Sequence, residues 1–255
     1  MSANSGPSGP RMAPGTGAAS RRTTGPGVWA VVVPALDEEA TVTEVVGSFH
    51  ALGARTVLVD NGSRDRTGDL ARRAGAEVVL EPRRGYGSAC LSGIEHLRRN
   101  EPPDVVAFAD CDGSVAAADV DRLIATVQDG RYDLVLGRRV PAEPGALLVH
   151  QRIGNAMLMR SLAPILGRPL RDPSPIRAIR WGLLARLDLR EQTYGLPIEM
   201  LVKAGRTGAR IGEVSVAYYR RRGGRSKVAG SLGGTCRATA GLFAVSFRLC
   251  LTHTE

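Results

Sequence analysis

Short apolar runs alternate with amphipathic stretches along residues 28–140. Runs rich in β-branched residues lie at 28–35, 55–59, 76–80, 105–109 and 133–137. Between them, apolar residues recur at helical spacing over 38–52, 66–74, 86–98 and 117–128. Strands separated by helices of this length are typical of βαβ units, so the pattern predicts an α/β fold with a mostly parallel sheet flanked by helices.

The pattern is less regular after residue 140. Residues 151–166 and 197–207 have helical spacing, and residues 209–219 favour a strand. An apolar segment at 238–251 predicts a C-terminal amphipathic helix, which could pack in the core or lie in a membrane interface. No linker-like composition divides residues 28–255, so we predict a single domain.

Residues 1–27 consist mainly of Gly, Pro, Ser, Ala and Thr with a few arginines and lack the apolar core of a secretory signal. We expect this tail to be disordered, because it cannot bury enough apolar surface to offset its ordering entropy. No run reaches the roughly 20 apolar residues that a membrane-spanning helix needs. The cysteines lack metal-site spacing, which favours a reducing, cytoplasmic environment.

The chain is basic, with 34 Lys and Arg against 25 Asp and Glu and a formal charge of +9. Such a balance favours anionic partners: nucleic acid, an acidic membrane surface or phosphorylated substrates. Aromatic residues make up only 4% of the chain, and no nucleic-acid reader motif is present. Without stacking platforms or such a motif, we expect no nucleic-acid binding.

Two carboxylates, Asp110 and Asp112, follow the apolar run at 105–109 and precede Gly113 and Ser114. Alternate residues of a strand share a face, so both carboxylates would point one way and Cys111 the other. In open α/β sheets, ligands bind at the carboxyl edge, where this pair is expected. Hard oxygen ligands suit Mg²⁺ or Mn²⁺ holding a substrate diphosphate, although an isolated pair also fits a solvated turn.

Three further turns rich in acidic residues or glycine follow the earlier strands, at 34–39, 59–65 and 81–87. Because parallel strands end at one edge, all four turns should lie together. Four such turns at one edge are hard to explain as ordinary solvent-facing loops. We therefore predict a functional site there.

The motifs in these turns resemble the nucleotide-sugar half of glycosyltransferase family 2, which has the GT-A (Rossmann-like) fold. They are Pro34-x-x-x-Glu38-Glu39, Asp60-Asn61-Gly62-Ser63-x-Asp65, Arg84-Gly85-x-Gly87 and Asp110-x-Asp112. Later segments are similar to the dolichol-phosphate mannose synthase-like branch, the polyprenyl-phosphate hexosyltransferases. Those segments are Gly137-Arg138-Arg139, Gln151-Arg152-x-Gly154-Asn155, Asp172 with Arg177, Ile198-Glu199-Met200 and Gly224-Arg225-Ser226-Lys227. The resemblance makes 28–140 the nucleotide-sugar half and 141–255 the acceptor half.

The resemblance also implies roles for individual residues. Nucleotide contacts fall on Pro34, Glu38, Asp60 and Asp110, and metal ligation falls on Asp110 and Asp112. Ser114 stands where some family members have a glutamine ligand, so the third protein ligand is either this serine or water.

Basic residues of the second half match family positions that hold the lipid phosphate and the diphosphate. They are Arg139, Arg152, Arg225, Ser226 and Lys227. Arginine can bind a phosphate through two parallel hydrogen bonds, and lysine adds a point charge. We assign catalysis to Asp112, Arg139, Arg225 and Lys227. Residues 220–222 are either part of this cluster, a solvated loop or a membrane-surface patch.

The resulting hypothesis is a metal-dependent inverting transfer of a hexose from a GDP- or UDP-hexose to a polyprenyl phosphate. The protein would be peripheral at the cytoplasmic face of a membrane. A phosphate acceptor is mostly ionised at neutral pH and needs no general base. One alternative is transfer to a soluble phosphorylated or alcohol acceptor, with Glu199 as base. Another is a non-catalytic subunit that binds nucleotide sugar or docks to a membrane partner.

Overall fold

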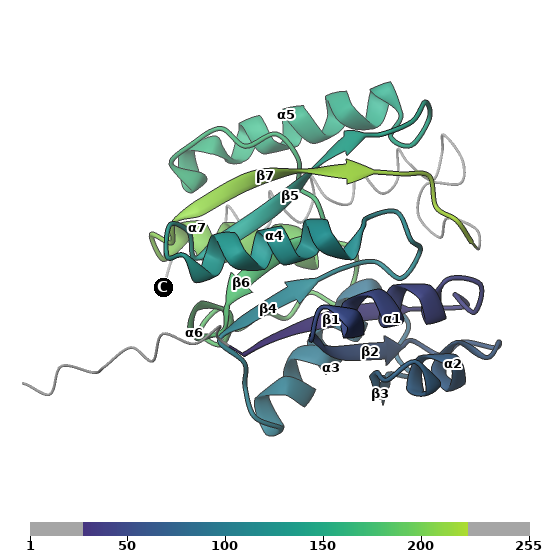
Figure 1. The fold of residues 1–255 in the computed structure, drawn as a ribbon. Helices are drawn as coiled ribbons and strands as arrows, with labels where there is room; N and C mark the ends of the chain where they lie inside the picture. The colour runs from purple at the N-terminus through teal and green to yellow at the C-terminus, as the bar shows by residue number, and fades with distance from the viewer. Residues whose placement is uncertain (1–27, 224–255) are drawn as a thin grey trace, which may run out of the picture.

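The computed structural model describes residues 28–223, which fold around one seven-stranded sheet (Figure 1). The strands are β1 (Trp29–Ala35), β2 (Arg55–Asp60), β3 (Glu77–Leu80), β4 (Val105–Phe108), β5 (Leu134–Pro141), β6 (Arg177–Arg180) and β7 (Ile211–Tyr218). The helices are α1 (Val42–Ala51), α2 (Thr67–Arg73), α3 (Tyr86–Arg99), α4 (Ala117–Gln128), α5 (Val149–Leu166), α6 (Trp181–Leu184) and α7 (Leu196–Arg206).

The strand order is β3-β2-β1-β4-β6-β5-β7. Strands β3, β2, β1 and β4 run parallel to one another, and β5 is parallel to β7. Strand β6 lies antiparallel between β4 and β5. The expected α/β fold with a mostly parallel sheet in a single domain is therefore confirmed.

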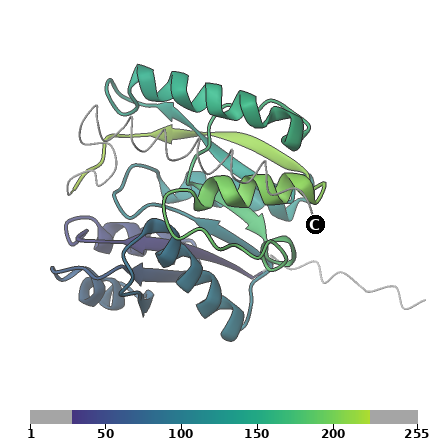
Figure 2. The same ribbon diagram turned by 180° about the vertical axis from the view of Figure 1, so that it is seen from behind.

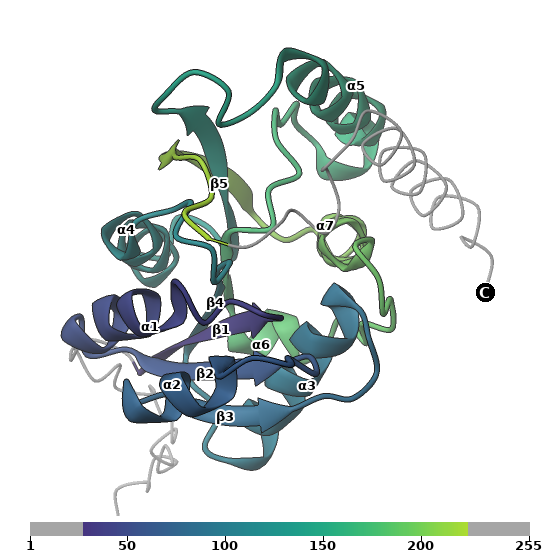
Figure 3. The same ribbon diagram turned by 90° about the vertical axis from the view of Figure 1, so that its right-hand side faces the viewer.

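Helices cover both faces of the sheet, as the view along it shows (Figure 3). Helices α1, α2 and α4 pack on one face over a core that includes Val31 and Val33. Helices α3, α6 and α7 cover the other face, seen from behind in Figure 2, over a core that includes Val32. Successive residues of β1 thus serve opposite cores, which explains its unbroken apolar run.

Two elements were not predicted, β6 and α6. Strand β6 has only four residues, with Arg177 and Arg180 at its ends, so it shows neither a long apolar run nor alternation. Strand β5 runs to Pro141 rather than residue 137, because its whole length pairs with β7 up to the partners Pro141 and Tyr218.

Helix α1 begins at Val42 and not at Glu38 as predicted. Asp37 has a φ of +51°, so the chain turns sharply after β1. The carbonyl of Glu38 then accepts hydrogen bonds from the amides of Thr41 and Val42. Residues 38–41 therefore form a turn that belongs to the sheet edge. This places Glu38 in the candidate site instead of on a helix surface.

The predicted disordered tail at 1–27, the predicted helix at 238–251 and the cluster at 225–227 lie outside the described residues. Within residues 28–223, no helix is both long enough and apolar enough to cross a bilayer.

Candidate active site

The turns after β1, β2 and β3 are joined at the carboxyl edge of the sheet through Asn61. Its amide Nδ2 donates to the carbonyls of Glu81 and Arg83 at 2.9 and 2.7 Å, and its Oδ1 accepts from the amide of Gly85 at 2.9 Å. The Asn61 backbone amide donates to the carbonyl of Ala35 at 2.9 Å. One buried residue, through its side chain and its backbone amide, thus fixes three of the four predicted turns relative to one another.

Asp60 ends β2 with its side chain buried at this edge. Its Oδ1 accepts a 2.8 Å hydrogen bond from the amide of Ser63. Its Oδ2 lies against Gly68 in the first turn of α2, where an added Cβ would stand 2.9 Å away. Pro34 is half-buried in the neighbouring strand, beside the β2 residue that precedes Asp60.

The fourth turn, after β4, is tied to the start of α1. Thr41 donates its hydroxyl hydrogen to the carbonyl of Cys111 at 2.6 Å. Strand β4 ends at Phe108, so Asp110, Cys111 and Asp112 lie in a turn. The strand alternation expected for this trio is therefore wrong, because the trio lies beyond the strand.

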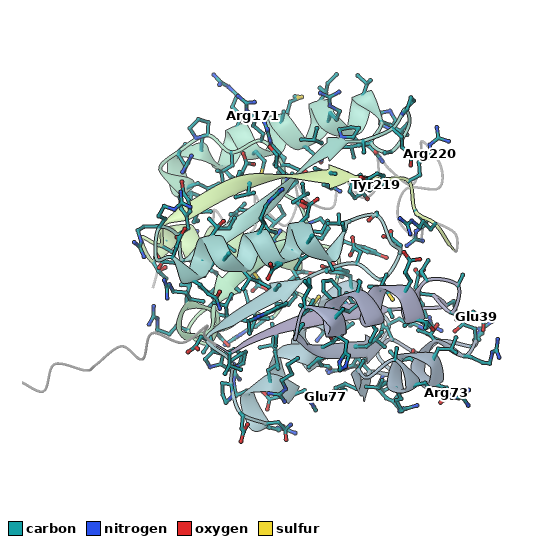
Figure 4. All side chains as sticks on the ribbon, viewed as in Figure 1. Glu39, Arg73, Glu77, Arg171, Tyr219 and Arg220 are labelled. Atoms are coloured by element: carbon teal, nitrogen blue, oxygen red, sulfur yellow. The ribbon has the colours of Figure 1, made fainter. Side chains whose placement is uncertain are left out.

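Asp112 is 7% exposed and accepts a 2.9 Å hydrogen bond from the amide of Ser114. The segment after β7 passes over it: Tyr219 N donates to Ser114 O at 2.9 Å, and Arg222 N donates to Asp112 O at 3.0 Å. Figure 4 shows Tyr219 and Arg220 at the same end of the molecule as Glu39, which follows Glu38. The acidic turn thus lies between the start of α1 and the end of β7.

Arg221 bridges two of the predicted site carboxylates. Its Nη2 lies 3.1 Å from Glu38 Oε1, and its Nε lies 3.2 Å from Asp112 Oδ2. Burial disfavours the charged guanidinium, but Asp112 and Glu38 overcome this effect and raise the pKa of Arg221. Glu38 and Asp112, which are 74 positions apart in the chain, therefore share one cation.

Asp110 experiences a different electrostatic environment. Burial and then the neighbouring Asp112 carboxylate raise its pKa well above the ordinary value, against the opposing charges of Arg139 and Arg221. Two carboxylates this close favour a bound cation, because a cation relieves both the burial cost and the mutual repulsion.

The side-chain oxygen atoms of Asp110, Asp112 and Ser114 suit a hard divalent cation. Ser114 is 1% exposed, and its Oγ makes no hydrogen bond of normal geometry within residues 28–223, although the Tyr218 phenol lies near it. Carboxylates with an available buried hydroxyl are the oxygen ligands that Mg²⁺ and Mn²⁺ prefer. No group of three or more His, Cys, Asp or Glu suited to a metal occurs in that described part of the chain. Substrate or water oxygens would therefore have to complete the coordination.

Arg139 lies on β5 next to the acidic turn and is held by Asp172. The pair is bidentate, with Arg139 Nε to Asp172 Oδ2 at 2.9 Å and Nη2 to Oδ1 at 2.7 Å. Asn155 of α5 donates to the same carboxylate at 3.2 Å, and the Tyr218 ring lies 5.4 Å from the guanidinium carbon. Sequence reasoning noted Asp172 as a motif residue but gave it no role.

Glu199 in the first turn of α7 holds the preceding loop. Its carboxylate accepts hydrogen bonds from the amides of Arg190 and Glu191, the shortest at 2.7 Å, and lies 2.8 Å from Lys203 Nζ. It is 4% exposed. These contacts define a positioning residue and not a base open to an acceptor.

The loop held by Glu199 packs directly on the Gly85–Gly87 turn. A Cβ on Gly87 would stand 2.2 Å from the carbonyl oxygen of Glu191, so no larger residue fits there. The same loop presents Tyr194, which is 43% exposed and stacks on Tyr86 with ring centroids 6.0 Å apart. Burial and then the charge of Asp110 raise the pKa of Tyr194, so this phenol lies near the acidic turn.

The structure therefore brings together most of the predicted acidic residues but only part of the basic set. Glu38, Asp110, Asp112 and Ser114 meet at the turn after β4, whereas Asp60 lies at the end of β2, on the far side of β1. Arg152 is exposed on α5, one turn before Asn155. Arg225, Ser226 and Lys227 lie outside the described residues.

A mostly parallel sheet with an acidic site at its carboxyl edge agrees with the GT-A fold of glycosyltransferases. The model for glycosyl transferase family 2 matches residues 30–181. The chain belongs to this family.

Several relatives match most of the chain. An uncharacterized glycosyltransferase of Mycobacterium tuberculosis is 40% identical and covers 80% of this chain and 91% of its own length. A dolichyl-phosphate hexose transferase of Haloferax volcanii is 31% identical, and an undecaprenyl-phosphate mannosyltransferase of Micrococcus luteus is 32% identical. Each of these two covers 80% of this chain and 88% of its own length.

Among solved structures, glucosyl-3-phosphoglycerate synthase from Mycobacterium tuberculosis has the same fold. Its complex with phosphoglyceric acid gives a TM-score of 0.69 at 24% identity over 88% of this chain and 80% of that one. Its complex with Mn²⁺, uridine diphosphate and glucosyl-3-phosphoglycerate gives 0.69 at 23% identity with the same coverage.

Proposed function

We propose that this glycosyltransferase moves a hexose from a nucleotide diphosphosugar to a polyprenyl phosphate at a membrane surface. The reaction would be metal-dependent and would invert the configuration at the anomeric carbon. The proposal has a donor side, at the acidic edge of the sheet, and an acceptor side, along α5 and the end of β5.

On the donor side, we assign Pro34, Glu38, Asp60 and Asp110 to the nucleotide. Carboxylates suit this task because they accept hydrogen bonds from base N–H and ribose hydroxyl groups. Asp110, Asp112 and Ser114 would hold Mg²⁺ or Mn²⁺. When bound, the ion would neutralise the diphosphate as negative charge builds on the leaving group. This assignment agrees with the Mn²⁺ and uridine diphosphate named for a structural neighbour.

On the acceptor side, the exposed apolar face of α5 is the observation that favours a lipid. Val149, Ile153 and Met157 follow one another at four-residue spacing and are 68%, 56% and 62% exposed. Arg152 and Arg160 are exposed on the same helix. A helix with apolar residues on one side and arginines beside them suits the boundary between acyl chains and anionic head groups. The names of the Haloferax and Micrococcus relatives support the same acceptor class.

Arg139 connects the two sides. Asp172 binds Nε and Nη2, along one edge of its guanidinium, and Nη1 would face an incoming phosphate. Arg152, Arg225, Ser226 and Lys227 would complete the phosphate site. A phosphate acceptor is already mostly dianionic at neutral pH, so these groups need only position it and offset its charge.

Transfer to a soluble phosphorylated acceptor is the second candidate, because phosphoglyceric acid is named in a structural neighbour. The exposed face of α5 has no function in such a reaction. A base role for Glu199, considered for an alcohol acceptor, conflicts with its three hydrogen-bonded partners. The lipid acceptor is therefore the stronger proposal.

The test is incubation of the purified protein with Mn²⁺, labelled nucleotide hexoses and liposomes that contain a polyprenyl phosphate. We expect label in the lipid fraction, lost on chelation of the metal and reduced at least about 100-fold in Asp112→Asn, since this carboxylate acts on the leaving group. The matched control is Asp69→Asn, an exposed carboxylate paired with Arg72. Label found only in water-soluble products would overturn the lipid acceptor.

A further inference from the structure

Residues 219–223 form a strap across the acidic turn. The strap is fixed to Ser114 by Tyr219 N and to Asp112 by Arg222 N, through hydrogen bonds of 2.9 and 3.0 Å. At its end, Gly223 lies so close to the start of α1 that an added Cβ would stand 3.1 Å from the Ala40 side chain. The strap therefore spans the gap between the turn after β4 and the turn after β1.

Within the strap, Arg221 points to the carboxylates that the donor site needs. It contacts Glu38 at 3.1 Å and Asp112 at 3.2 Å, and its own side chain is 26% exposed. Glu38 and Asp112 are 5% and 7% exposed, so one guanidinium offsets two buried negative charges. Arg221 contacts the Oδ2 atom of Asp112, while the Oδ1 atom of Asp112 accepts a hydrogen bond from the Ser114 amide.

We propose that Arg221 is the resident counter-cation of the donor site and must leave Asp112 before a divalent metal can bind there. The proposal rests on the metal site of the proposed function and adds an order of events. A metal ion alone has to displace the guanidinium from Asp112 and offers no anion in place of that carboxylate. A nucleotide diphosphate supplies new anionic oxygens for the displaced arginine, so metal and nucleotide bind together far better than the metal alone.

The physical basis is the cost of uncompensated buried charge. Without Arg221, the buried carboxylates of Glu38 and Asp112 lose their shared partner and stand beside Asp110. Removal of one partner from a buried ion pair leaves the other charge strongly unfavourable, and a cation relieves it. Loss of Arg221 should therefore increase the affinity for a divalent ion in the absence of nucleotide.

Arg222 is a matched control in the same strap. It pairs with Glu44 on the exposed side of α1, where the two side chains are 56% and 69% exposed. Arg222→Gln removes the same charge, one position away, and also removes an ion pair that ties the strap to α1. It leaves both donor-site carboxylates with their guanidinium.

The experiment is a titration of free Mn²⁺ by electron paramagnetic resonance, without a sugar or an acceptor, on the full-length wild type, Arg221→Gln and Arg222→Gln. Each protein is measured alone and with uridine or guanosine diphosphate. We expect Arg221→Gln to bind Mn²⁺ alone about two- to fivefold more tightly than the wild type, the range for a partly exposed ion pair that no longer competes. Arg222→Gln should match the wild type, and nucleotide should reduce the difference for Arg221→Gln.

Equal Mn²⁺ affinity in the wild type and Arg221→Gln would overturn the proposal. An equal increase in Mn²⁺ affinity in both variants would also overturn it, because that increase would reflect net charge or a loosened strap. A lack of Mn²⁺ binding in every sample would overturn it as well. If Arg221→Gln does not fold, Arg221→Lys provides the test, because lysine retains the charge but cannot bridge both carboxylates. We expect Arg221→Lys also to bind Mn²⁺ more tightly than the wild type. Failure of sugar transfer to lipid would leave this result unaffected, since the titration needs no acceptor.

Discussion

At the scale of single residues, Gly68 shows how closely the site is packed. A methyl group there would stand 2.9 Å from Asp60 Oδ2, a distance that forces the carboxylate to move. We expect Gly68→Ala to weaken nucleotide binding about tenfold while the fold persists, because only a side chain has to shift. Isothermal titration with the nucleotide diphosphate, together with a melting curve, would measure both effects.

Gly47→Ala is the control for the helical context of this change. Gly47 also lies within a helix, but no atom lies within 4 Å of an added Cβ. Alanine there should raise stability by about 0.5–1 kcal/mol from helix propensity alone and leave nucleotide affinity unchanged. Equal nucleotide affinity in the two variants would contradict the role given to Asp60.

The meeting of the acidic segments could be predicted from sequence, because Glu38, Asp60 and Asp112 lie at or just after strand ends and parallel strands end at one edge. The choice of these particular residues came from the family resemblance. Arg221 could not be found in this way. Its place in a basic run indicated a phosphate or solvent contact, and only the path of the strap after β7 brings its long side chain onto two carboxylates.

At the scale of secondary-structure elements, α7 positions the loop before it through Glu199. We expect Glu199→Gln to lower the free energy of unfolding by about 1–3 kcal/mol, because an amide has one acceptor oxygen for the loop amides and its NH₂ would face the Lys203 ammonium. Transfer activity should fall in proportion to the loss of loop order, with an unchanged pH profile. Thermal melting and the pH dependence of kcat/KM would test this.

A general base would behave differently. Its loss would reduce kcat by about 100-fold or more and remove one limb of the pH profile, with little effect on stability. Lys203→Met is a useful companion variant. It removes the cation that lies 2.8 Å from Glu199, but it leaves the carboxylate that accepts hydrogen bonds from the loop amides. If Lys203→Met and Glu199→Gln changed stability equally, the loop amides would not be the important partners of Glu199.

The elements themselves were predictable where the hydrophobic period was long. Helix α4 has the predicted bounds, since four apolar residues recur along one stripe. Strand β6 could not be predicted, because its four residues carry buried Arg177, whose guanidinium donates to the carbonyls of Pro173 and Pro197. Those acceptors come from other segments, so only the tertiary structure makes an arginine acceptable in that strand.

At the scale of the whole molecule, one sheet joins the acidic edge to the part of the chain that carries an exposed apolar helix, α5. Residues 28–140 follow βαβ rules, so their mostly parallel strands were predictable. The exposed face of α5 was not, because apolar residues at helical spacing normally indicate a buried face. Here Leu158 and Leu162 face the core, while Val149, Ile153 and Met157 remain exposed.

This exposed face leads to a prediction about membrane binding. We expect Ile153→Glu combined with Met157→Glu to weaken binding to anionic liposomes at least about tenfold, since two large apolar side chains no longer enter the interface. Both residues are exposed in the described structure, so the melting temperature and the affinity for nucleotide with Mn²⁺ should stay near wild type. Liposome co-sedimentation provides the measurement. The control is Leu80→Glu on β3, a residue that is 66% exposed and lies away from α5. If liposome binding fell equally in this control, α5 would not be the lipid-facing surface.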